Sequence, residues 1–243
     1  MDMSDAQQPD IAIDISELCF SWDNRLPILE IERLNFKKGQ RVFVEGPSGS
    51  GKSTLLSLIA GVALPQKGRI RINGRQITEL NGASRDRFRA DHIGFIYQMF
   101  NLIPYLSVLE NVTLPCRFSR RRRERAAARS SNFEAEAIRL LEKLGMDDAS
   151  VIRKPATELS VGQQQRVAAA RALIGTPEIL IADEPTSSLD TAQRENFIQL
   201  IFKECNRENT SLVFVSHDKS LEKLFDRTIR LNEINAVATR THR

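Results

Sequence analysis

Residues 46–53 combine three glycines with a lysine and a serine, the residue types of a phosphate-binding loop. Glycines let several backbone N–H groups point at one anion, and the start of the following helix adds its positive dipole end. Lys52 can reach the β- and γ-phosphates of a nucleoside triphosphate, and the Ser53 hydroxyl can bind Mg²⁺. The candidate nucleotide ligands of this loop are Gly46, Pro47, Ser48, Gly49, Ser50, Gly51, Lys52, Ser53 and Thr54.

The segments on either side of this loop favour phosphate binding over an ordinary Gly/Ser turn that caps a helix. The apolar run 41–45 before the loop predicts a short buried strand, and residues 54–60 after it predict a helix. A strand, a glycine loop and a helix in that order form the context that a phosphate-binding loop requires.

Two adjacent acids, Asp183 and Glu184, follow a continuous apolar strand predicted over residues 178–182. Ligands of open α/β sheets bind at the carboxyl ends of the strands, so both side chains can face the nucleotide. We expect Asp183 to hold Mg²⁺ together with Ser53, and Glu184 to act as the general base on the attacking water. The alternative is a pair of solvated acids, and the apolar strand and the loop upstream argue against it.

Two further polar side chains follow predicted buried strands. Gln98 comes after the strand expected at 91–97, and its amide can bind Mg²⁺ and contact the water near the γ-phosphate. His217 comes after residues 211–215, where it could contact the γ-phosphate and hold Glu184 and the water in register. Taken alone, Gln98 reads as a surface glutamine and His217 as a structural histidine.

Residues 159–166, which we call the signature segment, predict a second anion site. Ser160 is a suitable N-cap for a helix that runs through residue 174, so a capped helix is the simplest interpretation. The Ser160 hydroxyl, the Gly162 backbone, Gln163 and the helix N-terminus can also bind a phosphate. One nucleotide does not need two such sites from one chain. The sequence therefore predicts a two-fold homodimer that traps ATP between the loop of one subunit and the signature segment of the other.

The remaining sequence indicates one α/β domain. Alternating apolar and polar residues at 11–15 and 27–36 predict an antiparallel sheet, and strands that alternate with helices after residue 41 predict a parallel one. Residues 98–160 are expected to form a helical insertion. No apolar run approaches the roughly 20 residues of a membrane helix, and the polar N-terminus has no signal-peptide pattern, so we expect a cytoplasmic location.

Four motifs in order resemble ATP-binding cassette (ABC) ATPase domains across residues 11–231. The resemblance implies a P-loop NTPase fold, a single domain over 1–243, hydrolysis of ATP with Mg²⁺, and His217 as the switch histidine. It places Trp22 where an aromatic ring stacks on adenine, with Phe20 facing the core. The motifs are 46–53, Gln98, 159–166 and 179–185, and residues 188–190 match the family's D-loop.

The signature segment departs from the family pattern at one position. Val161 stands where the family has glycine, and its branched side chain restricts the backbone there. Ser160 and Gly162 remain, so we expect nucleotide binding to survive.

Residues 87–95 and 100–112 look like the lipoprotein-release and macrolide-export (LolD/MacB-like) branch of that family. This branch implies an integral membrane permease of the FtsX/MacB type, whose coupling helix docks beside Gln98. Residues 100–105 are too apolar for an ordinary exposed loop, so they either pack inside or form a groove for a partner helix. A related alternative is a cell-division complex in which ATP drives a change of shape and nothing is carried.

Residues 120–125 include five arginines. A solvated face is the simplest interpretation of this run, and contact with anionic lipid on the cytoplasmic face of the inner membrane is an alternative. No aromatic residues are interleaved with the arginines, so nucleic acid is not expected as a partner.

Overall fold

The computed structural model describes residues 10–23, 26–187 and 191–237. The sequence-based expectation that Ser188, Leu189 and Asp190 form a D-loop lies outside the described residues. Within the described ranges, no helix is both long enough and apolar enough to span a bilayer.

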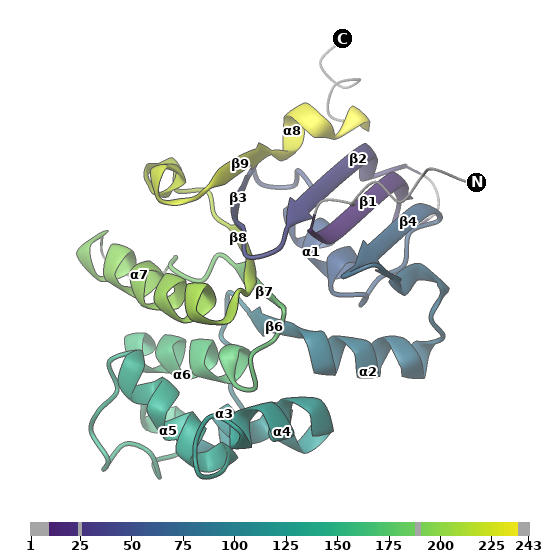
Figure 1. Cartoon of the computed structure of the whole chain (residues 1–243). Coiled ribbons are helices and arrows are strands. Elements are labelled where there is room, and N and C mark those ends of the chain that lie inside the picture. Colours follow the sequence, from purple (N-terminus) through teal and green to yellow (C-terminus); the bar gives the residue numbers. More distant parts are fainter. Residues whose placement is uncertain (1–9, 24–25, 188–190, 238–243) are drawn as a thin grey trace.

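A five-stranded parallel sheet forms the centre of the molecule, as the sequence predicts (Figure 1). Both faces of this sheet are covered, which explains why its inner strands β7 and β8 are nearly continuous apolar runs; every residue of β8 is buried. Side chains alternate between the faces, so Phe43 and Phe214 lie in one core while Val44 and Val215 lie in the other. In spatial order the strands are β6 (Ile93–Ile96), β7 (Ile179–Asp183), β8 (Ser211–Val215), β3 (Arg41–Glu45) and β9 (Arg227–Arg230).

An antiparallel sheet lies beside it, also as predicted (Figure 1). Asn73 and Gly74 both have positive φ, 48° and 79°, and close a two-residue hairpin between β4 and β5. In spatial order its strands are β2 (Leu29–Lys37), β1 (Ile11–Phe20), β4 (Lys67–Ile72) and β5 (Arg75–Gln76).

Helices fill the segments between the strands. Three of them, α3, α4 and α5, lie between residues 98 and 160, where the helical insertion was expected; that they form a separate unit stays a prediction. The α-helices are α1 (Lys52–Ile59), α2 (Gly82–His92), α3 (Val108–Phe118), α4 (Arg120–Ala127), α5 (Phe133–Lys143), α6 (Val161–Leu173), α7 (Thr191–Glu208) and α8 (Leu231–Ile234). Short 3₁₀ turns are η1 (Ile77–Glu79), η2 (Ala156–Glu158) and η3 (Lys219–Leu224).

The strand expected at 91–97 is wrong at its start. Asp91 and His92 are the last residues of α2, and β6 begins at Ile93. The Asn81 side chain accepts a hydrogen bond of 2.9 Å from the Ser84 N–H and so caps α2. This helix has a single buried side chain, Phe88, so its apolar periodicity is too weak to be detected in the sequence.

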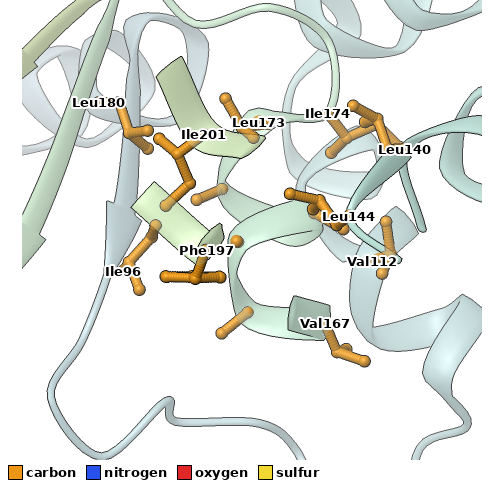
Figure 2. Close-up of a cluster of buried hydrophobic side chains, with 14 of the residues drawn as sticks. Ile96, Val112, Leu140, Leu144, Val167, Leu173, Ile174, Leu180, Phe197 and Ile201 are labelled. Carbon is orange, nitrogen blue, oxygen red and sulfur yellow. The ribbon is translucent and has the colours of Figure 1, made fainter. Parts of the chain in front are cut away.

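The helix α6 packs in the middle of the larger core (Figure 2). Its residues Val167 and Leu173 lie among side chains of α3, α5 and α7 and of the sheet. The packing of its residues from Val167 to Leu173 fixes the helix in the core, while its first residues lie at the surface. The other labelled members of this cluster are Ile96, Val112, Leu140, Leu144, Ile174, Leu180, Phe197 and Ile201.

The interpretation of residues 120–125 as a solvated face is wrong for Arg122, which is buried, while Arg121 and Arg125 are partly exposed and form ion pairs. Arg121 and Arg125 bond to one carboxylate oxygen of Glu178, at 2.5 and 2.7 Å, and His92 lies 3.0 Å from the other oxygen. Arg122 is buried and donates to the Ile174 and Ala172 carbonyls at 2.7 and 2.5 Å. Burial lowers the pKa of Arg122 to about 10. These arginines fasten α4 to the end of α6 and to the residue before β7.

Replacing Glu178 with Gln is expected to destabilise the protein at neutral pH. Burial by itself would raise the pKa of Glu178, but hydrogen bonds from His92, Arg121 and Arg125 outweigh it and lower the pKa from 4.5 to about 2. A lowered carboxyl pKa stabilises the fold above about pH 4.5, and this contribution is lost as the pH falls toward 2. The difference corresponds to at most about 3 kcal/mol, or a fall in Tm of up to about 10 °C.

Thermal unfolding of the parent and the Glu178→Gln variant between pH 3 and pH 7 measures this contribution. The difference in Tm should shrink toward low pH. Glu142→Gln, at an exposed position of α5, is the control and should leave Tm unchanged. A constant difference across the pH range would contradict the assignment.

Candidate nucleotide site

The glycine loop connects β3 to α1 with the geometry that phosphate binding requires. Gly51 has φ 97°, and a Cβ placed there would lie 2.8 Å from Leu29 Cδ2. A Cβ at Gly46 would lie 2.5 Å from Ser50 Oγ, so neither position accepts a side chain without a shift. The Lys52 ammonium donates to the Gly46 and Pro47 carbonyls at 2.7 and 3.0 Å, so its charge lies across the mouth of the loop.

The end of β7 brings Asp183 to the start of α1. There the Ser53 hydroxyl is close enough to Asp183 to lower the pKa of its carboxyl group. Burial raises the pKa of Asp183, and the neighbouring charge of Glu184 acts in the same direction, while Ser53 and Lys52 oppose them. The raised pKa indicates a carboxylate that would gain from a nearby cation.

The oxygen ligands at this position fit Mg²⁺. Hydroxyl, carboxylate and amide oxygens are the hard ligands that this ion prefers, and it is usually held by few side chains together with substrate phosphates. Across residues 10–23, 26–187 and 191–237, no three His, Cys, Asp or Glu side chains form a group that could hold a metal ion. The candidate Mg²⁺ ligands predicted from the sequence remain Ser53, Asp183 and Gln98.

Glu184 and His217 face each other at the ends of neighbouring strands β7 and β8. His217 Nδ1 lies 2.9 Å from Glu184 Oε2, an ion-pair distance without the angle of a hydrogen bond. Glu184 has φ 47°, a left-handed conformation that is rare outside glycine, and its N–H donates to the Val215 carbonyl at 3.0 Å. Strained backbone at such a position is typical of functional sites. The structure thus brings together the two residues that the sequence predicts as a pair.

The residues after His217 are anchored to two further elements. Asp218 pairs with Arg194 of α7, and Lys219 Nζ lies 2.7 Å from Glu45 Oε1 at the end of β3, just before the glycine loop. These contacts could not be predicted from the sequence, because the charges that pair are far apart in the chain. They hold the segment that carries His217 against the strand that carries the loop.

Gln98 follows β6 at the same edge of the sheet. Gln98 is exposed. Because β6 pairs with β7 in parallel, Gln98 follows the strand next to the one that ends at Asp183. Phe100 and Asn101, shortly after it, both have left-handed backbone, with φ 58° and 49°. Phe100 is buried in the core while Tyr105 is exposed, so the apolar segment 100–105 packs inside only in part.

The signature segment begins α6 with a reciprocal cap. Ser160 Oγ accepts from the Gln163 N–H at 3.3 Å, and Gln163 Oε1 accepts from the Ser160 N–H at 2.9 Å. Ser160 Oγ keeps its own proton, which it can donate to a phosphate oxygen. Val161 is 50% exposed, and a Cβ at Gly162 would contact nothing within 4 Å, so this helix end presents an open surface.

The structure does not bring the signature segment to the glycine loop of its own chain. Figure 1 places α1 behind β1 in the upper half of the molecule and α6 in the lower half, below α7. The groove beside Ser160 is lined by residues between 145 and 166 and by Gln193, with no contribution from residues 46–54. One chain therefore carries two candidate anion sites that lie apart in the fold.

Trp22 lies just after β1 with an open ring face. It is 62% exposed, and its ring meets Phe20 edge-on, with 4.8 Å between the ring centroids. Phe20 is buried, which confirms that it faces the core. The arrangement suits Trp22 for stacking on a flat base.

Trp22→Ala is expected to weaken ATP binding about 3- to 10-fold, because a stacked aromatic pair contributes roughly 0.5–1.5 kcal/mol. Titration with a fluorescent ATP analogue measures the Kd. Trp22→Phe keeps a ring in place and should recover most of the affinity. An unchanged Kd for the alanine variant would exclude the stacking role.

Comparisons with known proteins agree with this geometry. Residues 29–187 match the family described as ABC transporter. The lipoprotein-releasing system ATP-binding protein LolD of Bacteroides fragilis is 37% identical over 212 residues, 87% of this chain and 94% of LolD. The macrolide export ATP-binding/permease protein MacB of Bdellovibrio bacteriovorus is 36% identical over 225 residues, 91% of this chain and 33% of MacB.

Solved structures of the cassette MJ0796 of Methanocaldococcus jannaschii share the fold. Its dimeric structure has a TM-score of 0.77 at 34% identity and covers 90% of this chain and 93% of that one. A second structure of the same protein, a post-hydrolysis state with ADP and Pi, has a TM-score of 0.75.

These matches define the class of protein: the chain belongs to the ABC transporter family and is an ABC-type ATPase. Within the family it is similar to LolD and to a third of MacB, which confirms the resemblance stated from the sequence motifs. The fold predicted from those motifs, with its antiparallel and parallel sheets, is confirmed as well.

Proposed function

We propose that this chain is the ATP-hydrolysing subunit of an ABC transporter that dimerises around two ATP molecules and drives an FtsX/MacB-type membrane permease. The observation that carries the dimer is the separation of the glycine loop from the capped, open end of α6 in one chain. Two chains related by a two-fold axis would complete each other's sites. The dimeric MJ0796 cassette supports the same arrangement.

Within each site the residues have distinct tasks. The loop amides and Lys52 bind the phosphates, and Trp22 holds the base. Ser53, Gln98 and Asp183 would hold Mg²⁺, which when bound neutralises the phosphate charge. Glu184 takes the proton of the attacking water while His217 positions it. Ser160, Gly162 and Gln163 of the partner subunit close over the γ-phosphate.

A groove between α2, β6 and α3 offers a docking place for the permease, and we call it the docking groove. It has a volume of about 490 Å³, and its lining includes Tyr97, the residue directly before Gln98 in the sequence. Phe118 is 75% exposed at its edge, and Tyr97 is partly exposed. An apolar groove rimmed by charge suits an amphipathic helix of a partner. Among the lining residues are Arg87, Arg89, Phe95, Tyr97 and Phe118.

Docking through this groove would place the protein on the cytoplasmic face of the inner membrane through its permease. Of residues 120–125, Arg122 is buried and cannot reach lipid, whereas the Arg120 side chain is 82% exposed. No nucleic-acid partner is proposed.

Co-expression with an FtsX/MacB-type membrane permease tests the proposal. The complex should co-purify and raise the ATPase rate. Phe118→Glu should abolish co-purification while basal hydrolysis is kept, whereas Val62→Glu, at an exposed apolar position outside the groove, should bind as the parent does. If both variants bind the permease equally well, the docking groove is not the binding site for the permease.

A further inference from the structure

The helix α6 carries two buried polar side chains that bond to the segments following Gln98 and Glu184. Gln165 is 1% exposed and Arg171 is 9% exposed. Burying a polar side chain costs free energy unless hydrogen bonds offset it, so the partners of these two residues show what they do.

Arg171 holds the segment that follows Gln98. Its guanidinium donates to the Phe100 and Asn101 carbonyls at 2.5 and 2.6 Å. Both carbonyls belong to residues in left-handed backbone, a conformation that persists only where the surroundings impose it. Burial lowers the pKa of Arg171, which shows how fully this group is removed from water. The path of the chain after Gln98 therefore depends on a side chain of α6.

Gln165 holds the segment that follows Glu184. Its Nε2 donates to the Pro185 carbonyl at 2.5 Å, and Pro185 comes directly after Glu184. Its Oε1 is buried and has no hydrogen-bond partner among the described residues. In the part of the chain that the structure describes, the one hydrogen bond that the Gln165 side chain forms is therefore the bond that fixes the main chain next to Glu184.

The same helix begins at Ser160, which the proposed function places against the nucleotide on the partner subunit. A helix rises 1.5 Å per residue, so about 16 Å separate Ser160 from Arg171 along one packed element. Resting on that proposed function, we infer that α6 links the two ATP sites of the dimer. Gln165 and Arg171 are positioning residues: Gln165 positions Glu184, and Arg171 positions Gln98, in one ATP site. Both positions depend on how Ser160 of the same helix contacts the nucleotide in the other site.

A buried arginine outside the catalytic loops provides a matched control. Arg122 also donates to two main-chain carbonyls, those of Ala172 and Ile174, at 2.5 and 2.7 Å. Its removal should cost stability in the same way as removal of Arg171. It contacts neither the segment after Gln98 nor the segment after Glu184.

The test compares Arg171→Met, Gln165→Met and Arg122→Met in the full-length protein. ATP affinity of the monomer, kcat and the Hill coefficient for ATP are measured with thermal stability. Gln165→Met and Arg171→Met should keep the ATP Kd within about threefold and lower kcat by about 10- to 100-fold, the effect of a catalytic group misplaced by about 1 Å. Their Hill coefficients should fall toward 1. Arg122→Met should lower Tm without changing kcat.

Two further results complete the test. Arg171→Lys, which keeps a donor and the charge, should recover part of kcat. Gln165→Met removes the unpaired Oε1 as well as the donor to Pro185, so Tm should change little while kcat falls. A parental kcat and Hill coefficient in Gln165→Met would overturn the inference, as would equal losses of kcat in Arg122→Met. If these variants behave as the parent but Glu184→Gln still abolishes hydrolysis, the link through α6 fails and the proposed function stands.

Discussion

Glu184→Gln is expected to lower the rate of ATP hydrolysis by about 10²–10⁴-fold while ATP still binds. The amide has the shape of the carboxylate but cannot accept a proton from water. Glu184 lies 2.9 Å from His217 in a left-handed backbone position, so the substitution leaves the arrangement of the site intact and removes only the base. Because the composite site would fill and not turn over, the variant should accumulate as an ATP-bound dimer.

Phosphate release measures the rate, and gel filtration with and without ATP measures the dimer. Glu124→Gln, which alters a solvent-exposed acid on α4, is the control and should hydrolyse as the parent does. Hydrolysis at the parental rate by Glu184→Gln would remove the general-base role.

Ser160→Arg is expected to prevent ATP-dependent dimer formation while each monomer binds ATP with unchanged affinity. The substitution places a long cationic side chain at the open end of α6 and removes the reciprocal cap with Gln163. Loss of a cap costs about 0.5–2 kcal/mol, which this well-packed helix should tolerate. The dominant effect is therefore at the interface between subunits.

The helix α3 provides the matched control for this substitution. Ser107 caps it with the same reciprocal bonds to Glu110. Ser107→Arg should lower stability by a similar amount and still form the dimer with ATP. If both arginine variants dimerise equally, the signature segment does not contribute to the interface.

The parts of the molecule that could be predicted are those specified by local sequence. The glycine loop lies between an apolar strand and a helix, and both acids stand at the end of another apolar strand. Buried parallel strands give continuous apolar runs, which are visible in a single sequence. The positions of Gln98, Asp183, Glu184 and His217 at one edge of the sheet follow from that pattern and from the rule that ligands bind where such strands end.

The parts that could not be predicted depend on contacts between distant residues. The arginines of α4 resemble a solvated face in sequence, because their partner Glu178 lies more than fifty residues further along the chain. Gln165 and Arg171 bond to main-chain carbonyls, and a carbonyl carries no mark in the sequence. The one sign of these contacts in the sequence was Arg171, a charged residue among the alanines of α6, where an apolar residue would be expected.

Complementation between two inactive variants tests the composite site most directly. Lys52→Ala removes the lysine that binds the phosphates but keeps its signature segment, whereas Ser160→Arg keeps the glycine loop and spoils the signature segment. Each variant alone should be inactive. Neither variant should form the ATP-bound dimer with itself, so the productive dimer pairs one chain of each kind and holds one complete site. Hydrolysis should then return to at most about half of the parental rate. A mixture as inactive as its separate components would contradict a site shared between two chains.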